Sequence, residues 1–165
     1  MTNKIKSSKV AAFLNTAASG ASEVWSRFGK GISSLPISYG TKTSTSTYID
    51  EDNATTTVDG YEIGFDTEQV AMKGDPVFDY VDNIRNRLAT GSDCETSVIL
   101  ANIYDLTEAN GVYTGEVQKF GATVAITDFE LNGGEVVKIK YKVSLNGNPE
   151  KKTISLKSDG TVTLS

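Results

Sequence analysis

Histidine is absent from this 165-residue chain, and cysteine occurs once, at Cys94. The lack of histidine excludes a Ser-His-Asp triad, histidine-ligated zinc and imidazole acid–base chemistry. Because Cys94 has no partner for an internal disulfide, we interpret it as a structural, buried thiol and not as a nucleophile. The sequence therefore predicts a protein that is not an enzyme, with no catalytic residues and no cofactor.

Long apolar runs are also missing. No stretch reaches 18 apolar residues, which argues against a transmembrane helix and a membrane partner. The apolar patch at residues 10–14, VAAFL, is shorter than the hydrophobic region of a signal peptide, so we reject that interpretation. With 38% apolar and 22% charged residues, the composition is that of a globular protein. We expect a single domain over residues 1–165.

Basic residues are scarce in the middle of the chain. Residues 41–110 carry fourteen acidic and four basic residues, whereas residues 1–40 carry one acidic and five basic residues. Binding of nucleic acid depends on Lys and Arg side chains that neutralise phosphates. The acidic middle therefore argues against nucleic acid as a ligand, and it fits a surface that repels nucleic acid.

The acids of residues 50–62, DEDNATTTVDGYE, suggest calcium binding as one alternative. An EF-hand loop needs an oxygen ligand at its fifth position and glycine at its sixth. Counted from Asp50, these positions hold Ala54 and Thr55, so the match fails. We therefore expect no metal, and a solvated acidic turn or protein-contact loop instead. A carboxylate-dependent hydrolase has the least support, because no pair of carboxylates has a matching partner.

One helix is clearly encoded, at about residues 75–90. Asp75 is placed to cap its first turn, and Pro76 follows at the first helical position, where a missing N–H costs nothing. Gly91 is placed to terminate it. Apolar residues recur in steps of four, three and four, at Val77, Val81, Ile84 and Leu88, with Phe78 and Tyr80 alongside. A lone helix of this length is unstable in water, so we expect this stripe to pack against a sheet.

The rest of the chain is typical of strands and turns. Apolar and β-branched patterns predict strands at 9–15, 24–28, 61–74, 97–106, 118–129, 135–145, 151–156 and 161–164, with an edge-like strand near Pro36. Tight hairpins are predicted at Asn132-Gly133, Asn146-Gly147 and Asp159-Gly160. The fold class is therefore mainly β, a β-sandwich or half-barrel with one flanking helix.

Two of these strands make specific predictions about burial. In the first, alternate residues should face opposite sides, with Val10, Ala12 and Leu14 on one face and Ala11 and Phe13 on the other. In the strand at 24–28, Trp25 is the single tryptophan of the chain, and we interpret it as a core aromatic. The strand at 61–74 should be half-buried through its alternating Tyr61, Ile63 and Phe65.

Residues 41–57 form the most unusual segment. Nine of its seventeen residues are serine or threonine, and three acids follow one another at Asp50, Glu51 and Asp52. Threonine favours strands, whereas Asn53 and the acids favour a turn. We expect an extended hairpin or a long loop, at about residues 40–60, that is too polar on both faces to lie in a core.

The chain contains, in this order between about residues 8 and 156, the stretches KVAAFLNT, VWSRFGKGISSL, TYIDEDNATTTVDGYE, KGDPVFDYVDNIRN and NGNP. In sequence and spacing it resembles the major tail proteins, or tail tube proteins, of phages and prophages of Gram-positive bacteria. The most specific parts are YIDEDNATT and KGDPVFDYV, neither of which has a catalytic rationale.

This resemblance implies a structural virion protein of the phage tail, assembled in the cytoplasm of the host bacterium. Copies would form rings of six, whose inner sheets join into one barrel around a channel, and the rings would stack into a tube bridged by long loops and an N-terminal arm at residues 1–8. The tape-measure protein would fill the tube before DNA passes through without specific binding. The tail terminator and distal tail proteins are further expected partners. Six chains of net charge −5 would carry about −30, which disfavours adhesion of DNA.

We expect subunit contacts in the polar segment, carried by Tyr48, Asp50, Glu51, Asp52 and Asp59. Tyrosine is enriched in protein interfaces, and the acids would meet a basic patch on the next ring. Candidates for that patch are the lysines outside the acidic middle: Lys4, Lys6, Lys9, Lys30 and those of KIKYK at residues 138–142.

Two other interpretations stay open. The tube of a contractile injection or secretion device would fit the same residues. A monomeric β-sandwich that adheres to carbohydrate belongs to a different class, and it would need an exposed aromatic platform, for which only one tryptophan is available. Light scattering over a concentration series separates the classes, because an adhesion module stays monomeric and a tube protein polymerises.

Overall fold

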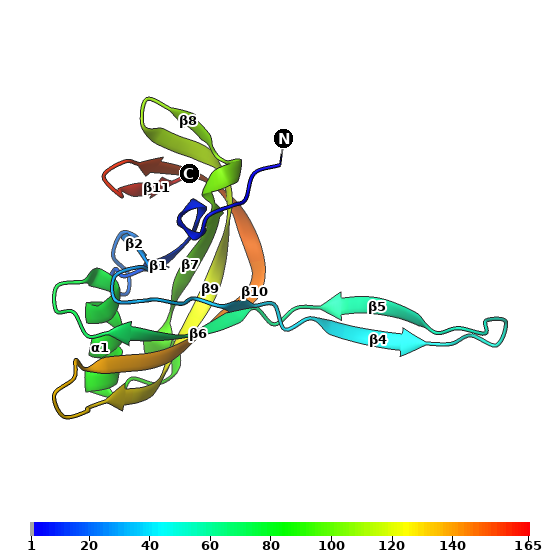
Figure 1. Cartoon of the computed structure of the whole chain (residues 1–165), viewed down its shortest axis with the longest axis horizontal. Helices are drawn as coiled ribbons and strands as arrows, with labels where there is room; N and C mark the ends of the chain where they lie inside the picture. The colour runs from blue at the N-terminus through cyan, green and yellow to red at the C-terminus, as the bar shows by residue number, and fades with distance from the viewer. Residues whose placement is uncertain (1) are drawn as a thin grey trace.

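A computed structural model describes residues 2–165 and shows a mainly antiparallel β protein with one α-helix in that range (Figure 1). Its frame is a hairpin of two long strands, β9 (Val112–Glu130) and β10 (Lys138–Lys157). At about 3.3 Å per residue, each strand runs for roughly 60 Å. The expected mainly-β fold class with a single flanking helix is confirmed.

Each long strand pairs with different neighbours along its length. The shorter strands of this sheet are β1 (Val10–Asn15), β2 (Trp25–Arg27), β3 (Ile37–Ser38), β6 (Gly64–Val70), β7 (Glu95–Asn102), β8 (Thr107–Ala109) and β11 (Val162–Leu164). Short 3-10 turns precede β1 (Ser7–Lys9), precede β7 (Gly91–Cys94) and follow β7 (Ile103–Asp105). One part of the sheet has the order β2-β1-β7-β9-β10-β6-β3, and beyond it β8 pairs with β9 and β11 with β10.

The sheet carries a core on each face of β1. Ala12 and Leu14 belong to the larger core, which the helix covers, whereas Ala11 and Phe13 belong to a smaller core on the other side. The predicted alternation of these four residues is confirmed. The smaller core also holds Trp25, as interpreted, together with residues from the far part of the long strands.

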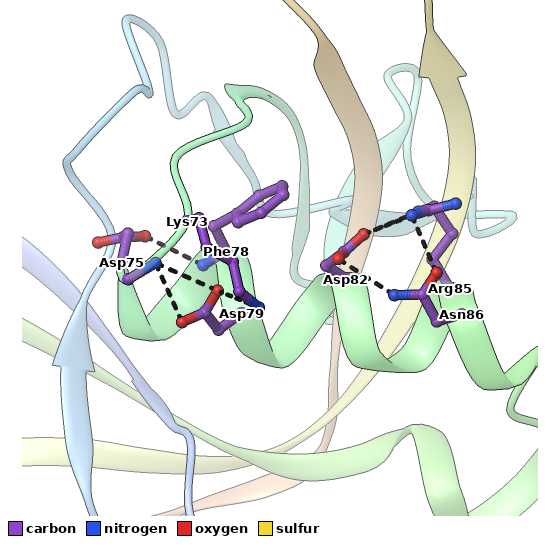
Figure 2. Close-up of polar contacts among 8 residues, drawn as sticks. Lys73, Asp75, Phe78, Asp79, Asp82, Arg85 and Asn86 are labelled. Carbon is purple, nitrogen blue, oxygen red and sulfur yellow. Dashed lines mark hydrogen bonds and ion pairs between the residues drawn. The ribbon is translucent and has the colours of Figure 1, made fainter.

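The helix α1 (Pro76–Arg87) covers the larger core with Val77, Phe78, Val81 and Ile84. Its beginning is capped as predicted, because Asp75 Oδ2 accepts a hydrogen bond from the Phe78 N–H at 3.0 Å. In return, the Gly74 N–H donates to Asp79 Oδ2 at 3.2 Å (Figure 2). The helix beginning therefore fastens itself to the chain that leads into it.

The predicted end of the helix is wrong. The helix stops at Arg87, and Leu88 adopts a left-handed conformation with φ 48°, which points its side chain outward so that it is 82% exposed. Leu88 therefore does not join the apolar stripe. Gly91 lies beyond the helix and begins the next 3-10 turn.

The prediction of two strands at 135–145 and 151–156 is also wrong, because β10 continues through Asn146-Gly147. Gly147 has φ 69°, and the pairing with β9 is irregular between Asn146 and Glu150. An Asn-Gly pair signals a positive φ, which an irregularity inside a strand uses as readily as a hairpin turn. The strand predicted at 118–129 likewise extends back to Val112.

Residues 41–57, for which a hairpin or a long loop was expected, belong to a separate two-stranded sheet. It consists of β4 (Lys42–Ser46) and β5 (Thr55–Gly60). Figure 1 shows this hairpin extending away from the rest of the molecule. We call residues 41–59 the arm and the remaining described chain the body.

Candidate assembly surfaces

The arm buries none of its residues. Every position from 41 to 59 is exposed. Its strands are joined by backbone pairing and by hydroxyl contacts across them, such as Ser44 Oγ to Thr57 Oγ1 at 3.0 Å and Thr45 Oγ1 to Thr56 Oγ1 at 3.2 Å. An isolated two-stranded hairpin is marginally stable in water. Burial within its own chain therefore contributes little to the stability of the arm.

The tip of the arm is a turn in which the Glu51 N–H donates to the Tyr48 carbonyl at 3.0 Å. Tyr48 is 62% exposed, and Ile49 is exposed completely. The acids Asp50 and Asp52 flank Glu51, and none of the three forms an ion pair within residues 2–165. The tip thus combines exposed apolar side chains with unpaired negative charge.

Four of the five residues expected at subunit contacts therefore lie together, and one does not. Asp59 lies near the base of the arm, where its Oδ1 accepts from Ser44 Oγ at 3.0 Å. The tip also contains Ile49, which is not among the predicted contact residues. The signal was available, because Ile49 is the only aliphatic residue larger than alanine between residues 38 and 57.

The base of the arm is anchored by two side-chain contacts and by a close backbone approach at Gly40. The rings of Tyr39 and Tyr61 meet edge to face with 6.4 Å between their centroids. Lys42 and Glu62 form an ion pair at 2.5 Å, which lowers the pKa of the Glu62 carboxyl through hydrogen bonding and charge. Gly40 has φ 50°, and a Cβ there would lie 2.5 Å from the Glu62 carbonyl oxygen. Tyr61 is consequently exposed and does not belong to a half-buried strand as predicted.

A groove of about 620 Å³ lies between the N-terminal segment, β1, and the chain that follows β2. We call it the N-terminal groove. The larger apolar residues of its lining include Ile5, Val10, Phe28, Ile32, Leu35 and Ile37. Lys6 and Arg27 also line it, and Arg27 donates to the Ser8 and Val10 carbonyls at 3.2 and 3.4 Å. Neither basic residue has an ion-pair partner in the described chain.

Two of the three lysines of KIKYK, Lys138 and Lys140, are in a different situation from the basic residues of the N-terminal groove. Lys138 pairs with Glu68 at 3.1 Å, and Lys140 pairs with Glu130 at 2.6 Å. These hydrogen bonds raise the pKa of both lysines and keep them charged. Because both are neutralised within their own chain, they are weaker candidates for a basic patch than the lysines of the N-terminal segment.

A buried polar cluster connects the sheet with the helix beginning. Tyr141 Oη donates to Gln69 Oε1 at 3.0 Å, and Gln69 Nε2 donates to Asp75 Oδ2 at 2.9 Å and to the Lys30 carbonyl at 3.0 Å. Burial, followed by the charge of Asp75, raises the pKa of the Tyr141 hydroxyl. Every buried side-chain polar atom of residues 2–165 has a hydrogen-bond partner. This cluster is therefore satisfied internally and holds α1 on the sheet.

Other candidate sites are few in the part of the chain that the structure describes. Cys94 is half-buried, not buried as expected, and its thiol donates to the Ala89 carbonyl at 3.2 Å. Residues 2–165 contain no group of three or more potential metal ligands, and none of their helices has the length and apolar character needed to cross a membrane.

Comparisons with known proteins find similarity among solved structures. No protein-family model matches the chain, and no curated protein matches it significantly. Among solved structures, a chain in the cryo-EM structure of the anti-feeding prophage (AFP) baseplate, 6-fold symmetrised, is similar with a TM-score of 0.48 and 11% identity. The match covers 96% of this chain and 99% of that chain. At this TM-score and identity, the likeness assigns neither a family nor a function to this chain.

Proposed function

We propose that this protein is a structural subunit of a phage tail tube, which assembles with copies of itself into rings that stack around a channel. The arm carries the proposal. It is a paired hairpin whose residues are all exposed. Because an isolated two-stranded hairpin is marginally stable in water, we expect contact with another molecule to stabilise it. The sequence resemblance to tail tube proteins makes a second copy the natural partner.

The borders of the sheet support assembly side by side. The sheet ends in β2 and β3, which are three and two residues long. Beyond β3, the pairing along the outer edge of the seven-residue β6 is reduced, within residues 2–165, to one bridge between Ile32 and Gln69, with side-chain hydrogen bonds to the same segment. Unpaired edges invite pairing with another chain, and closure of a ring is one way to satisfy them.

In the proposed tube, the sheet face opposite α1 lines the channel. Ile139 and Tyr141 point to the helix side, so Lys138 and Lys140 lie on the other face with Glu68 and Glu130. Most of the positive charge on this face is therefore compensated, and the chain as a whole carries −5. Such a lining would let DNA pass without specific binding, because phosphate binding needs uncompensated Lys and Arg.

The proposed role implies protein partners and no catalytic activity. The tube would enclose a tape-measure protein before DNA, and it would meet the tail terminator and distal tail proteins in a virion assembled in the bacterial cytoplasm. The role is structural, with no catalytic residue and no cofactor. The same subunit design would serve a non-contractile tail or the tube of a contractile device.

Electron microscopy and light scattering of the purified chain over a concentration series test this function. The full chain should form tubes, whereas a variant in which Gly-Gly replaces residues 42–59 should stop at single rings or smaller oligomers, because the arm no longer reaches the next ring. Circular dichroism should show that the variant body remains folded. A matched control, Val136→Ser, removes an exposed apolar side chain outside the arm and should assemble normally.

A full chain that remains a compact monomer at millimolar concentration would contradict the proposal. That outcome would favour the alternative class, a monomeric β-sandwich binding module, for which the arm would be a contact loop to an unrelated target.

A further inference from the structure

We infer that the tip of the arm in one copy docks into the N-terminal groove of a second copy. Tyr48 and Ile49 fill the apolar groove, and the three acids of the tip face the basic residues at its rim. This contact rests on the proposed self-assembly and specifies which surface of the next copy receives the arm.

The occupant of the groove is identified by what the arm exposes. Ile49 is fully exposed at the turn, and Tyr48 beside it is 62% exposed, although the rest of the arm is polar except for Ala54 and Val58. The body of the same chain does not cover them, because all residues of 41–59 are exposed and the arm points away from the body (Figure 1). A pair of large side chains at the end of a polar hairpin is suited to insertion into a pocket on another molecule.

The receiving surface is identified by its lining. The N-terminal groove has a volume of about 620 Å³, and nine of its fourteen lining residues are apolar, the others being Lys6, Arg27 and three serines. Ile5, on its N-terminal wall, is 58% exposed, so the groove offers apolar surface that is still in contact with water. In the second large groove, beside the arm's own base, half of the fourteen lining residues are polar, such as Glu62, Lys142 and Asn146, so it matches an apolar tip less well.

Charge complementarity favours the same pairing. Asp50, Glu51 and Asp52 have no ion-pair partner in the described chain, and neither have Lys4 and Lys6, which flank Ile5. Arg27 adds a third cation at the groove. By contrast, Lys138 and Lys140 are already paired. Opposite charges around an apolar contact guide association and fix its orientation.

Disulfide cross-linking tests the contact directly. In a Cys94→Ser background, we would combine Ile49→Cys with Ile5→Cys, assemble the chain and add a mild oxidant. A disulfide needs Cα atoms about 4.4–6.8 Å apart, so a ladder of covalent multimers on a non-reducing gel is expected only if the tip enters the groove. The matched control combines Ile49→Cys with Val136→Cys, another exposed apolar position, and should give no ladder.

Charge exchange supplies an independent test. Reversing the tip with Asp50→Lys, Glu51→Lys and Asp52→Lys should raise the critical concentration for assembly about 10-fold, and Lys4→Glu with Lys6→Glu should act similarly. Combining the two sets should restore assembly to near its original concentration. Combining the reversed tip with Lys151→Glu and Lys152→Glu instead reverses as many lysines away from the groove and should not restore it. Ile49→Asp should raise the critical concentration about 10-fold to 100-fold through loss of apolar burial.

The outcomes separate this contact from the function on which it rests. If the unmodified chain does not assemble, both fail. If it assembles but the control pair cross-links as well as the Ile5–Ile49 pair, or the exchanged charges do not restore assembly, the self-assembly proposal stands and the docking site is wrong. A ladder specific to the Ile5–Ile49 pair together with recovery by charge exchange supports it.

Discussion

The body of the sheet buries residues on both faces of β1, whereas the arm buries none of its residues. Both regions are paired β structure, yet their side chains differ in kind. The body presents alternating apolar residues to two cores, and the arm presents hydroxyls and acids to water on both faces. Since apolar burial is the main favourable term in folding, the body has its own source of stability, whereas the arm by itself is marginally stable.

Hydrogen exchange should show the largest contrast between the two regions. In the dispersed chain, amides of residues 43–46 and 55–58 should be at least about 1,000-fold less protected than those of β7, because the arm opens locally and β7 only on global unfolding. Mass spectrometry of exchanged peptides measures this. Equal protection of the two regions in a monomer would mean that the arm is stable by itself.

Core truncation should distinguish the regions by free energy of unfolding. Phe13→Ala empties space in the smaller core and should cost about 3–5 kcal/mol. Thr45→Ala in the arm should change the free energy by less than about 0.5 kcal/mol. Urea unfolding of both variants, with equal m-values, checks the prediction. A comparable cost at Thr45 would show that the arm contributes to the cooperative unit.

Removal of the buried Asp75 carboxylate at the first turn of α1 should cause the next largest loss in the free energy of unfolding. Asp75→Ala removes the acceptor of the Phe78 N–H and one of the two acceptors of the Gln69 amide, so we expect a loss of about 2–4 kcal/mol in chemical unfolding. Asp75→Asn keeps an acceptor and should cost less. Asp79→Ala, a more exposed acid in the same turn, is the matched control, and an equal loss there would contradict a special role for the buried cluster.

The helix end should allow a stabilising substitution. Leu88→Gly relieves a left-handed conformation that costs a leucine energy and removes a side chain that is already exposed, so it should raise stability by about 0.5–1 kcal/mol. Arg87→Gly, one residue earlier and still inside the helix, should have the opposite sign. Thermal unfolding of the two variants measures the difference, and a loss of stability in both would refute the interpretation of Leu88.

The ion pairs on the sheet face should have the smallest effect on stability, which should appear as a pH dependence of Tm. The hydrogen bond from Lys138 lowers the pKa of Glu68 from its ordinary value of 4.5. A lowered folded-state pKa contributes stability above the unfolded value, and this contribution is lost as the pH falls through the lowered value. Glu68→Gln should therefore lower Tm slightly at pH 7 and have no effect at about pH 2.

The control for that pH series is Glu108→Gln, an exposed acid without an ion pair in the described chain. It should leave the pH dependence of Tm unchanged. A difference between Glu68→Gln and the unmodified chain that grows as the pH falls below 4.5 would have the wrong sign for a paired carboxylate.

Features that depend on near neighbours in the chain were predictable. The alternation in β1 and the Asp75-Pro76 helix beginning are local patterns, and both are confirmed. The end of the helix was not predictable in the same way, because Gly91 is the better residue for a left-handed position and the chain nevertheless turns at Leu88. The continuous β10 was missed because an Asn-Gly pair does not tell a strand irregularity from a turn.

The candidate assembly surfaces were likewise predictable only where near neighbours in the chain determine them. The polar composition of residues 41–57 predicted an exposed segment with a turn at the acids, and Tyr48, Asp50, Glu51 and Asp52 do lie at the tip. The separation of Asp59 from them depends on the length of the two arm strands. The N-terminal groove could not be predicted, because its walls come from segments that only the folded sheet brings together.

The sequence by itself determined the mainly-β class, the beginning of the helix and the polar character of the arm, since each depends on residues within a few positions of one another. Only the tertiary structure decided which surfaces remain open. Gln69 is polar and still fully buried, because Tyr141, 72 residues away, and Asp75 satisfy its amide. Ile49 is apolar and still fully exposed, because no part of the body reaches the end of the arm. Burial is decided by distant partners, and a local pattern does not contain them.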